Sequence, residues 1–146
     1  MGKPKEELLN NIKTHFSVGA IIRNDEGELL MIDRLKPPFG FACPAGHIDE
    51  GEEPLTAVLR EVKEETGLTI TSYKEIPIDV YNDAPSEPCS RGINNHIWKL
   101  YEMKATGNFI FKKDEVKSIG WYTIDQVREI KLESIWRYWL IKLNII

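Results

Sequence analysis

Acidic residues are concentrated between Gly46 and Leu68, where seven of the twenty-three residues are Asp or Glu. An α-helix turns by about 100° per residue, so Glu61, Glu64 and Glu65 would lie on one face of a helix. Like charges one turn apart destabilise a helix by roughly a few tenths of a kcal/mol per pair, and anions near a helix C-terminus oppose the helix macrodipole. The spacing therefore requires a compensating positive charge.

Two sources of positive charge fit this spacing. One is a solvated helix face on which Arg60 and Lys63 neutralise the carboxylates. The other is a divalent cation, because Mg²⁺ takes oxygen ligands and usually binds between a few carboxylates and substrate phosphates. In the second case Glu52, at the start of the helix, can add a further carboxylate. Gly46 would let the preceding loop adopt backbone conformations that a side chain blocks.

The helix that would carry these carboxylates is predicted to run from Glu53 or Pro54 to Thr66. Proline suits the first helical turn, where its missing N–H does no harm, and Gly67 suits the position just past the helix end. Apolar residues recur on one face of this helix. They are Leu55, Val58, Leu59 and Val62.

Strands and further helices are predicted around this element. Apolar and β-branched runs indicate strands at 15–22, 29–34, 41–44, 68–81, 96–105, 109–111 and around Trp121. The first two strands would form a hairpin, because the turn residues Asn24, Asp25 and Gly27 lie between them. Helices are predicted near the N-terminus (Leu8, Leu9, Ile12), after a cap at Thr123 or Asp125, and at the C-terminus (Ile135, Trp136, Trp139, Leu140, Leu143). This mixture implies an α+β fold in which a mixed sheet is flanked by helices.

Composition limits the class of protein. The length suits one domain spanning residues 1–146, and a net charge of −4 argues against a long nucleic acid as partner. No run of eighteen apolar residues occurs, so no membrane helix is expected. The N-terminus has no apolar core of signal-peptide type, and Cys43 and Cys89 fit no zinc or redox motif. We therefore expect a cytoplasmic protein, with the aromatic C-terminal helix in the core or in a homodimer interface.

The order of the residues is more specific than their composition. From Gly46 the chain has five residues, Glu52, seven residues and then the run REVKEETGL at 60–68. This order resembles the complete signature of the Nudix hydrolase family, GX5EX7REUXEEXGU with U apolar, and no position is missing. The strands before the signature and the segment 114–127 after it also resemble the family. The resemblance thus covers most of the chain.

This resemblance implies an α/β/α sandwich that hydrolyses a diphosphate linkage in a nucleoside diphosphate joined to another group X, with Mg²⁺ or Mn²⁺ as cofactor. Glu64 and Glu65 would be the main metal ligands, and Glu61 would be a ligand or a base that orients water. Glu52 would complete the acidic cluster, and Arg60 would position the carboxylates through a salt bridge.

Residues outside the helix would complete such a site. The carbonyl of Ala45 would be a further metal ligand by this resemblance. A downstream acidic residue shortly before a tryptophan is also implied; Glu115, six residues before Trp121, fits best and Asp114 is second.

A small nucleotide is the implied partner, but its base and the group X stay open. The candidates for binding it are Gly46, Arg34, Phe41, Tyr81 and Trp98, and each of the three aromatic residues would equally suit core packing. Two other functions also stay open. One is cleavage of nucleoside triphosphates in cleaning of the nucleotide pool. The other is a non-catalytic regulatory domain that binds a nucleotide, although such domains commonly lose the signature carboxylates, which are all present here.

Overall fold

A computed structural model describes residues 2–78 and 95–146. Its elements in chain order are β1 (Glu6–Leu9), β2 (Ile12–Arg23), β3 (Leu29–Arg34), β4 (Phe41–Ala42), β5 (Ala45–His47), α1 (Pro54–Thr66), β6 (Thr69–Ile76), β7 (Asn95–Thr106), β8 (Val116–Tyr122), α2 (Ile124–Glu129) and α3 (Ser134–Lys142).

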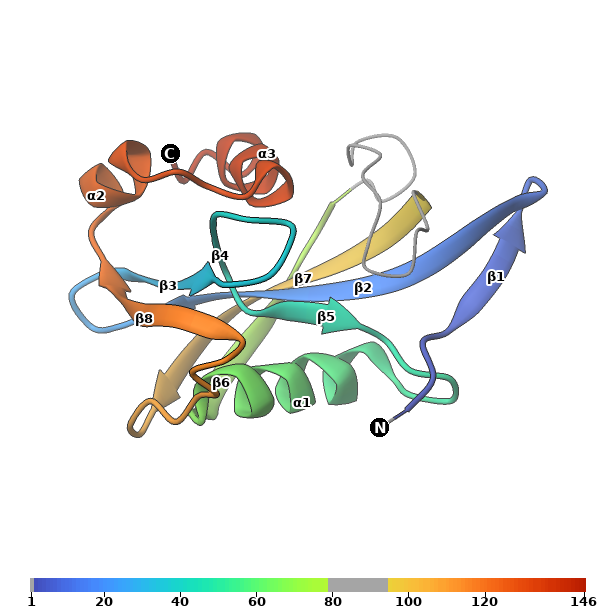
Figure 1. Ribbon diagram of the computed structural model, residues 1–146, viewed down its shortest axis with the longest axis horizontal. Helices are drawn as coiled ribbons and strands as arrows, with labels where there is room; N and C mark the ends of the chain where they lie inside the picture. The colour runs from blue at the N-terminus through green and yellow to red at the C-terminus, as the bar shows by residue number, and fades with distance from the viewer. Residues whose placement is uncertain (1, 79–94) are drawn as a thin grey trace.

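The strands form one mixed sheet between two helical layers. Its central order is β4-β3-β2-β7-β6, with β1 and β5 paired to β2 and β8 paired to β3. The β2–β7 pair is parallel, and the other pairs are antiparallel. Helix α1 covers one face of this sheet, while α2 and α3 cover the other (Figure 1). This arrangement confirms the predicted fold of a mixed sheet flanked by helices.

Strand β2 separates two apolar cores because successive side chains point to opposite faces of a sheet. Val18, Ala20 and Ile22 pack on the α1 side with Val58 and Val62. On the opposite face, Ile21 belongs to the core that contains the buried aromatic residues of α3, Trp136 and Trp139. The C-terminal aromatic face is therefore part of the protein's own core.

Helix α1 begins and ends as predicted. Pro54 occupies the first turn, and Gly67 follows the helix in the left-handed conformation with φ 77°. The N–H of Gly67 donates to the carbonyl of Lys63 at 3.0 Å, which closes the last turn. One predicted core residue was wrong: Leu59 is 36% exposed, and the smaller Ala57 is fully buried instead.

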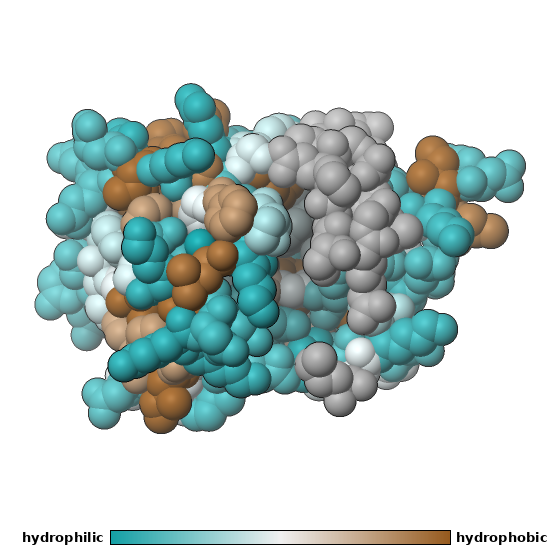
Figure 2. All heavy atoms as spheres, viewed as in Figure 1, coloured by the Kyte–Doolittle hydropathy of each residue, from teal (hydrophilic) through white to brown (hydrophobic). Residues whose placement is uncertain are grey.

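The predicted N-terminal helix was wrong. Glu6–Leu9 and the start of β2 form an antiparallel hairpin. Its turn residues Asn10 and Asn11 both have positive φ, 50° and 64°, as a type I′ hairpin turn requires. The hairpin projects from the body of the protein (Figure 1), and hydrophobic residues are visible on it (Figure 2). Leu8 and Ile12, whose spacing suggested a helix face, are exposed.

The predicted hairpin of β2 and β3 is present, because the two strands pair antiparallel through Arg23 and Leu29, although the longer pairing of β3 is with the distant β8. One other strand prediction was wrong. The segment 109–111 is not a strand. Its Ile110 N–H instead donates to the Thr66 carbonyl at 2.9 Å, where it meets the end of α1. None of the helices in the described residues is long and apolar enough to cross a membrane.

Candidate active site

The guanidinium of Arg60 joins the acidic residues of α1 to the loop before it. Its Nε and Nη2 donate to the two carboxylate oxygens of Glu52 at 2.9 and 3.0 Å, and its Nη1 donates to Glu61 at 2.8 Å. The same side chain donates to the His47 carbonyl at 3.0 Å and has longer ion pairs with Glu64 at 3.4 Å and Asp49 at 3.5 Å. The expected salt bridges of Arg60 are thus present. The planar guanidinium group suits this geometry because it carries several N–H donors in fixed directions.

Strand β5 passes directly over the carboxylates of α1. A Cβ placed on Gly46 would lie 2.1 Å from Cδ of Glu61, so any side chain here would displace that carboxylate. One residue earlier, the Ala45 N–H donates to Oε1 of Glu65 at 2.8 Å. The backbone of β5 therefore fixes Glu65 by a hydrogen bond and leaves room for Glu61 by the absence of a side chain.

Burial perturbs the titration of these carboxyl groups. Desolvation raises the pKa of Glu61 to about 7, against the opposing effect of Arg60. Desolvation and the charge of Glu61 raise the pKa of Glu65 to about 8, against the Ala45 amide and the more distant Arg34. In contrast, hydrogen bonds from Arg60 lower the pKa of Glu52. Burial is therefore the main cause of the raised pKa of Glu61 and Glu65, and Arg60 offsets it only in part at Glu61.

A cleft with a volume of about 250 Å³ opens beside the C-terminal half of α1. It brings together Glu64, Glu65 and the predicted downstream acid Glu115. The other predicted acidic residues, Glu52 and Glu61, are not among the residues that line it. Across the described residues, no three His, Cys, Asp or Glu side chains are already arranged to hold a metal ion.

Basic residues line the same cleft. Arg34 was among the predicted substrate-binding residues, but Lys36 and Lys112 were missed. They lie more than seventy positions apart in the sequence, and only the pairing of β3 with β8 brings their segments together. No local sequence motif could therefore have indicated these two lysines.

The predicted aromatic substrate-binding residues do not line the cleft. Phe41 packs against Tyr122 with ring centroids 5.5 Å apart, and Trp98 packs against Trp136 at 5.9 Å. Both belong to the core on the α3 side of the sheet. Tyr81 lies outside the described residues.

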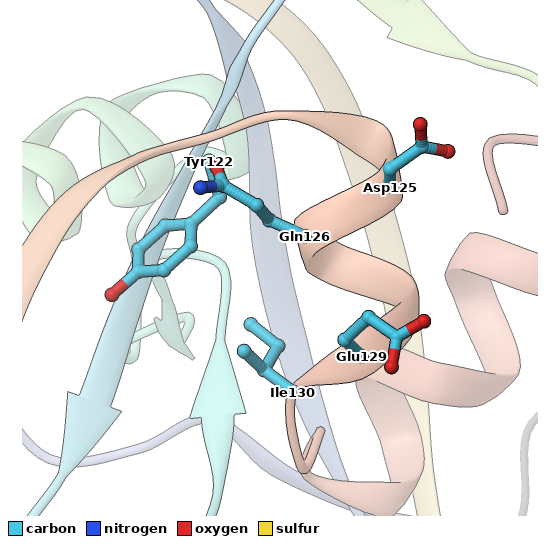
Figure 3. Close-up of a pocket in the computed structure, with 5 residues that line it drawn as sticks. All are labelled: Tyr122, Asp125, Gln126, Glu129 and Ile130. Carbon is cyan, nitrogen blue, oxygen red and sulfur yellow. The ribbon is translucent and has the colours of Figure 1, made fainter.

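A larger hollow, of about 370 Å³, lies on α2 and not at the carboxylates. Figure 3 shows Gln126 and Ile130 on the side of Tyr122, whereas Asp125 and Glu129 point away from it. Asp125 forms an exposed ion pair with Arg128. Because α2 lies on the face of the sheet opposite α1 (Figure 1), this hollow is separate from the acidic cluster, and the smaller cleft is the better candidate active site.

Sequence comparison finds relatives that are named pyrophosphatases. The chain is 40% identical over 120 residues to an ADP-ribose pyrophosphatase of Methanocaldococcus jannaschii, a match that covers 80% of this chain and 66% of that protein. It is 33% identical over 112 residues to an RNA pyrophosphohydrolase of Bartonella quintana, covering 68% of this chain and 65% of the relative. The matches thus span less than two-thirds of the length of these curated relatives.

The fold has similar solved structures. A MutT protein from Methanosarcina mazei Go1 superposes with a TM-score of 0.64 at 20% identity, and the match covers 99% of this chain and 96% of that one. At this identity the likeness concerns the fold alone. A model of the NUDIX domain matches residues 13–143, and since that match includes the whole acidic signature and nearly all of the sheet, the chain belongs to the Nudix family.

Proposed function

We propose that this protein hydrolyses a diphosphate linkage in a nucleoside diphosphate joined to a further group, with Mg²⁺ or Mn²⁺ as cofactor. The observation that carries the proposal is the placement of three signature carboxylates along α1: Glu61 and Glu65 lie beneath β5, and Glu64 and Glu65 line the cleft. The names of the two sequence relatives, both of which act on pyrophosphate linkages, support the same reaction class.

The chemistry of these residues fits a divalent cation. Carboxylate oxygens are the ligands that Mg²⁺ prefers. Burial raises the pKa of Glu61 and Glu65, so a cation beside them would favour their ionised form. Glu64 and Glu65 would hold the ion, with Glu61 and the carbonyl of Ala45 as further ligands. When bound, such an ion neutralises phosphate oxygens and lowers the pKa of water.

Protein groups would supply the remaining steps. Glu61, which lies beneath Gly46 of β5, is one candidate to accept a proton from the attacking water if it does not hold the ion itself. Glu115 is the alternative base, because it reaches the same cleft from the start of β8. Arg60 and Glu52 would act as positioning residues, since they hold the acidic face of α1 against the loop that precedes it.

A nucleotide panel tests the reaction. The purified protein is incubated with ADP-ribose, nucleoside triphosphates and other nucleotides in Mg²⁺ or Mn²⁺, and the products are separated. We expect a nucleoside monophosphate as one product. Inorganic pyrophosphate as the other product would identify a triphosphate substrate. Tight nucleotide binding without turnover would instead favour the regulatory alternative.

A pair of variants tests the site. Glu64→Gln removes a charge from the cleft and should lower kcat by orders of magnitude without loss of the fold, because its side chain is more than half exposed. Glu26→Gln, in the exposed turn before β3, is the matched control and should turn over normally. Near-normal turnover in Glu64→Gln would exclude the proposed role of Glu64.

A further inference from the structure

The chain before β2 contacts the loop that joins β5 to α1. The Lys5 N–H donates to the Ile48 carbonyl at 2.8 Å, and the Glu50 N–H donates to the Lys3 carbonyl at the same distance. Figure 1 shows the N-terminal segment crossing this loop. We refer to residues 2–6 as the brace, because they hold the loop by two backbone hydrogen bonds.

The brace precedes the part of the chain that the NUDIX model matches, which is residues 13–143. Its Pro4 is nevertheless buried, and it forms an antiparallel bridge with Asp49. A Cβ placed on Gly2 would collide with the carboxylate of Asp49. The brace therefore packs closely against the loop at Asp49.

A second set of contacts joins the brace to β2. Oε1 of Glu6 lies 3.1 Å from Nε2 of His15, and Nζ of Lys5 lies 4.4 Å from the centre of the Phe16 ring. The Phe16 carbonyl in turn accepts a hydrogen bond from the Ile48 N–H at 2.8 Å. Both backbone polar groups of Ile48 are thus hydrogen-bonded, the carbonyl to the brace and the N–H to β2.

The loop connects the brace to the acidic face of α1. The Asp49 N–H donates to Oε1 of Glu52, and the Glu52 N–H donates to the Asp49 carbonyl, both at 3.0 Å. Asp49 and Glu52 lie 3.5 and 2.9 Å from the guanidinium of Arg60, which also donates to Glu61. A continuous series of contacts therefore joins the brace to the carboxylates of the candidate active site.

We propose that the brace positions the turn 49–52 and, through Arg60, the carboxylates of α1, so that a divalent cation binds there more tightly than it would without the brace. This inference rests on the proposed function, because the cation belongs to it. Groups that orient the ligands of a metal ion strengthen its binding. If the loop also adopts other conformations, the apparent affinity falls, because only the molecules with an assembled site bind the ion.

Proline at position 5 removes one hydrogen bond of the brace. Lys5→Pro deletes the N–H that reaches Ile48, and Lys5→Ala, which keeps this N–H, is the matched control. Binding of Mn²⁺ to the full chain is measured without substrate, from the electron paramagnetic resonance signal of the free ion. We expect the Kd for Mn²⁺ to be about two- to fivefold higher in Lys5→Pro than in Lys5→Ala, up to the contribution of one backbone hydrogen bond. Equal Kd values in the two variants would overturn the proposal.

A milder variant and a second measurement cover the case in which Lys5→Pro does not fold. Pro4→Gly removes the buried ring but keeps the backbone groups that pair with the loop, so it should raise the Kd in the same direction. Hydrogen exchange followed by mass spectrometry should show faster exchange of the Glu50 N–H in either variant, because that group is bonded to the brace. Unchanged exchange in the loop would contradict the role of the brace.

Kinetics separate positioning from a simple loss of folded protein. Lys5→Pro should raise the Mg²⁺ concentration that gives half the maximal rate by the same factor as the Kd for Mn²⁺, with KM for the nucleotide unchanged at saturating Mg²⁺. A variant that is only less stable loses rate equally at every Mg²⁺ concentration, and that result would refute positioning. Binding of Mn²⁺ without hydrolysis of any nucleotide would refute the proposed function, whereas the difference in Kd between Lys5→Pro and Lys5→Ala would still decide on the brace.

Discussion

Replacement of Arg60 is the strongest test of how the acidic face is held together. Arg60→Ala removes the partner of Glu52 and Glu61, whose side chains are only 13% and 16% exposed. Removal of one partner from a buried ion pair costs about 3–5 kcal/mol, because the other charge stays buried without compensation. The exposed Glu64 adds little. Since Arg60 is itself partly exposed, we expect a loss of about 3 kcal/mol in the free energy of unfolding.

The loss should depend on pH. Arg60 lowers the pKa of Glu61 against the larger effect of burial. Without Arg60 the carboxyl of Glu61 would hold its proton to still higher pH, and an ionised Glu61 would be costly. The penalty of Arg60→Ala should therefore be larger at pH 8 than at pH 5, where Glu61 is protonated in both proteins. Urea denaturation at the two pH values, in EDTA, measures the difference.

Two variants make the result interpretable. Arg60→Lys keeps the charge, but one ammonium cannot replace three guanidinium nitrogens that reach Glu52, Glu61 and the His47 carbonyl. It should recover less than half of the lost stability. Arg128→Ala breaks a single exposed pair with Asp125 and should change stability by less than about 0.5 kcal/mol. Equal effects of Arg60→Ala and Arg128→Ala, or full recovery in Arg60→Lys, would refute the reasoning.

Three further outcomes are expected. Gly46→Ala should lower kcat about 10²-fold while the fold persists, because the new Cβ displaces the Glu61 carboxylate; steady-state kinetics and circular dichroism check this. Gly19→Ala places a Cβ 2.5 Å from a buried tryptophan ring of α3 and should cost about 1–3 kcal/mol in urea denaturation, whereas Gly120→Ala, with its nearest neighbour at 3.6 Å, should cost less. In EDTA, stability should fall as pH rises from about 5 to 8. The folded state holds protons on Glu61 and Glu65 that the unfolded chain has released, and Mg²⁺ at pH 8 should restore stability, as thermal melting can show.

The local features of the site could be predicted because they depend on neighbours in the sequence. Pro54 and Gly67 set the two ends of α1, and the 100° rotation per residue places the carboxylates together. Gly46 marked a close approach of the loop, which the structure identifies as contact with Glu61. These inferences need only helix geometry and the conformational freedom of glycine.

The parts that could not be predicted depend on long-range strand pairing. Lys36 and Lys112 share a cleft only because β3 pairs with β8. The aromatic residues Phe41 and Trp98 were ambiguous between stacking on a base and core packing, and only the position of α3 on the sheet shows that both pack in the core. The N-terminal helix was predicted wrongly for a different reason. Three apolar residues within five positions are compatible with a helix and with a strand, so their spacing alone could not decide between them.

The basic side chains near the acidic face of α1 fall into two groups in the described residues. Arg60 is surrounded by carboxylates, so it is occupied in holding the acidic face and is not available to substrate. Arg34, Lys36 and Lys112 line the cleft and have no ion pair within the described residues. Without Arg60 the carboxylates would repel one another, and without the second group the cleft would lose its basic side. A charge reversal at Lys36 should therefore weaken phosphate binding without loosening α1, whereas loss of Arg60 should do both.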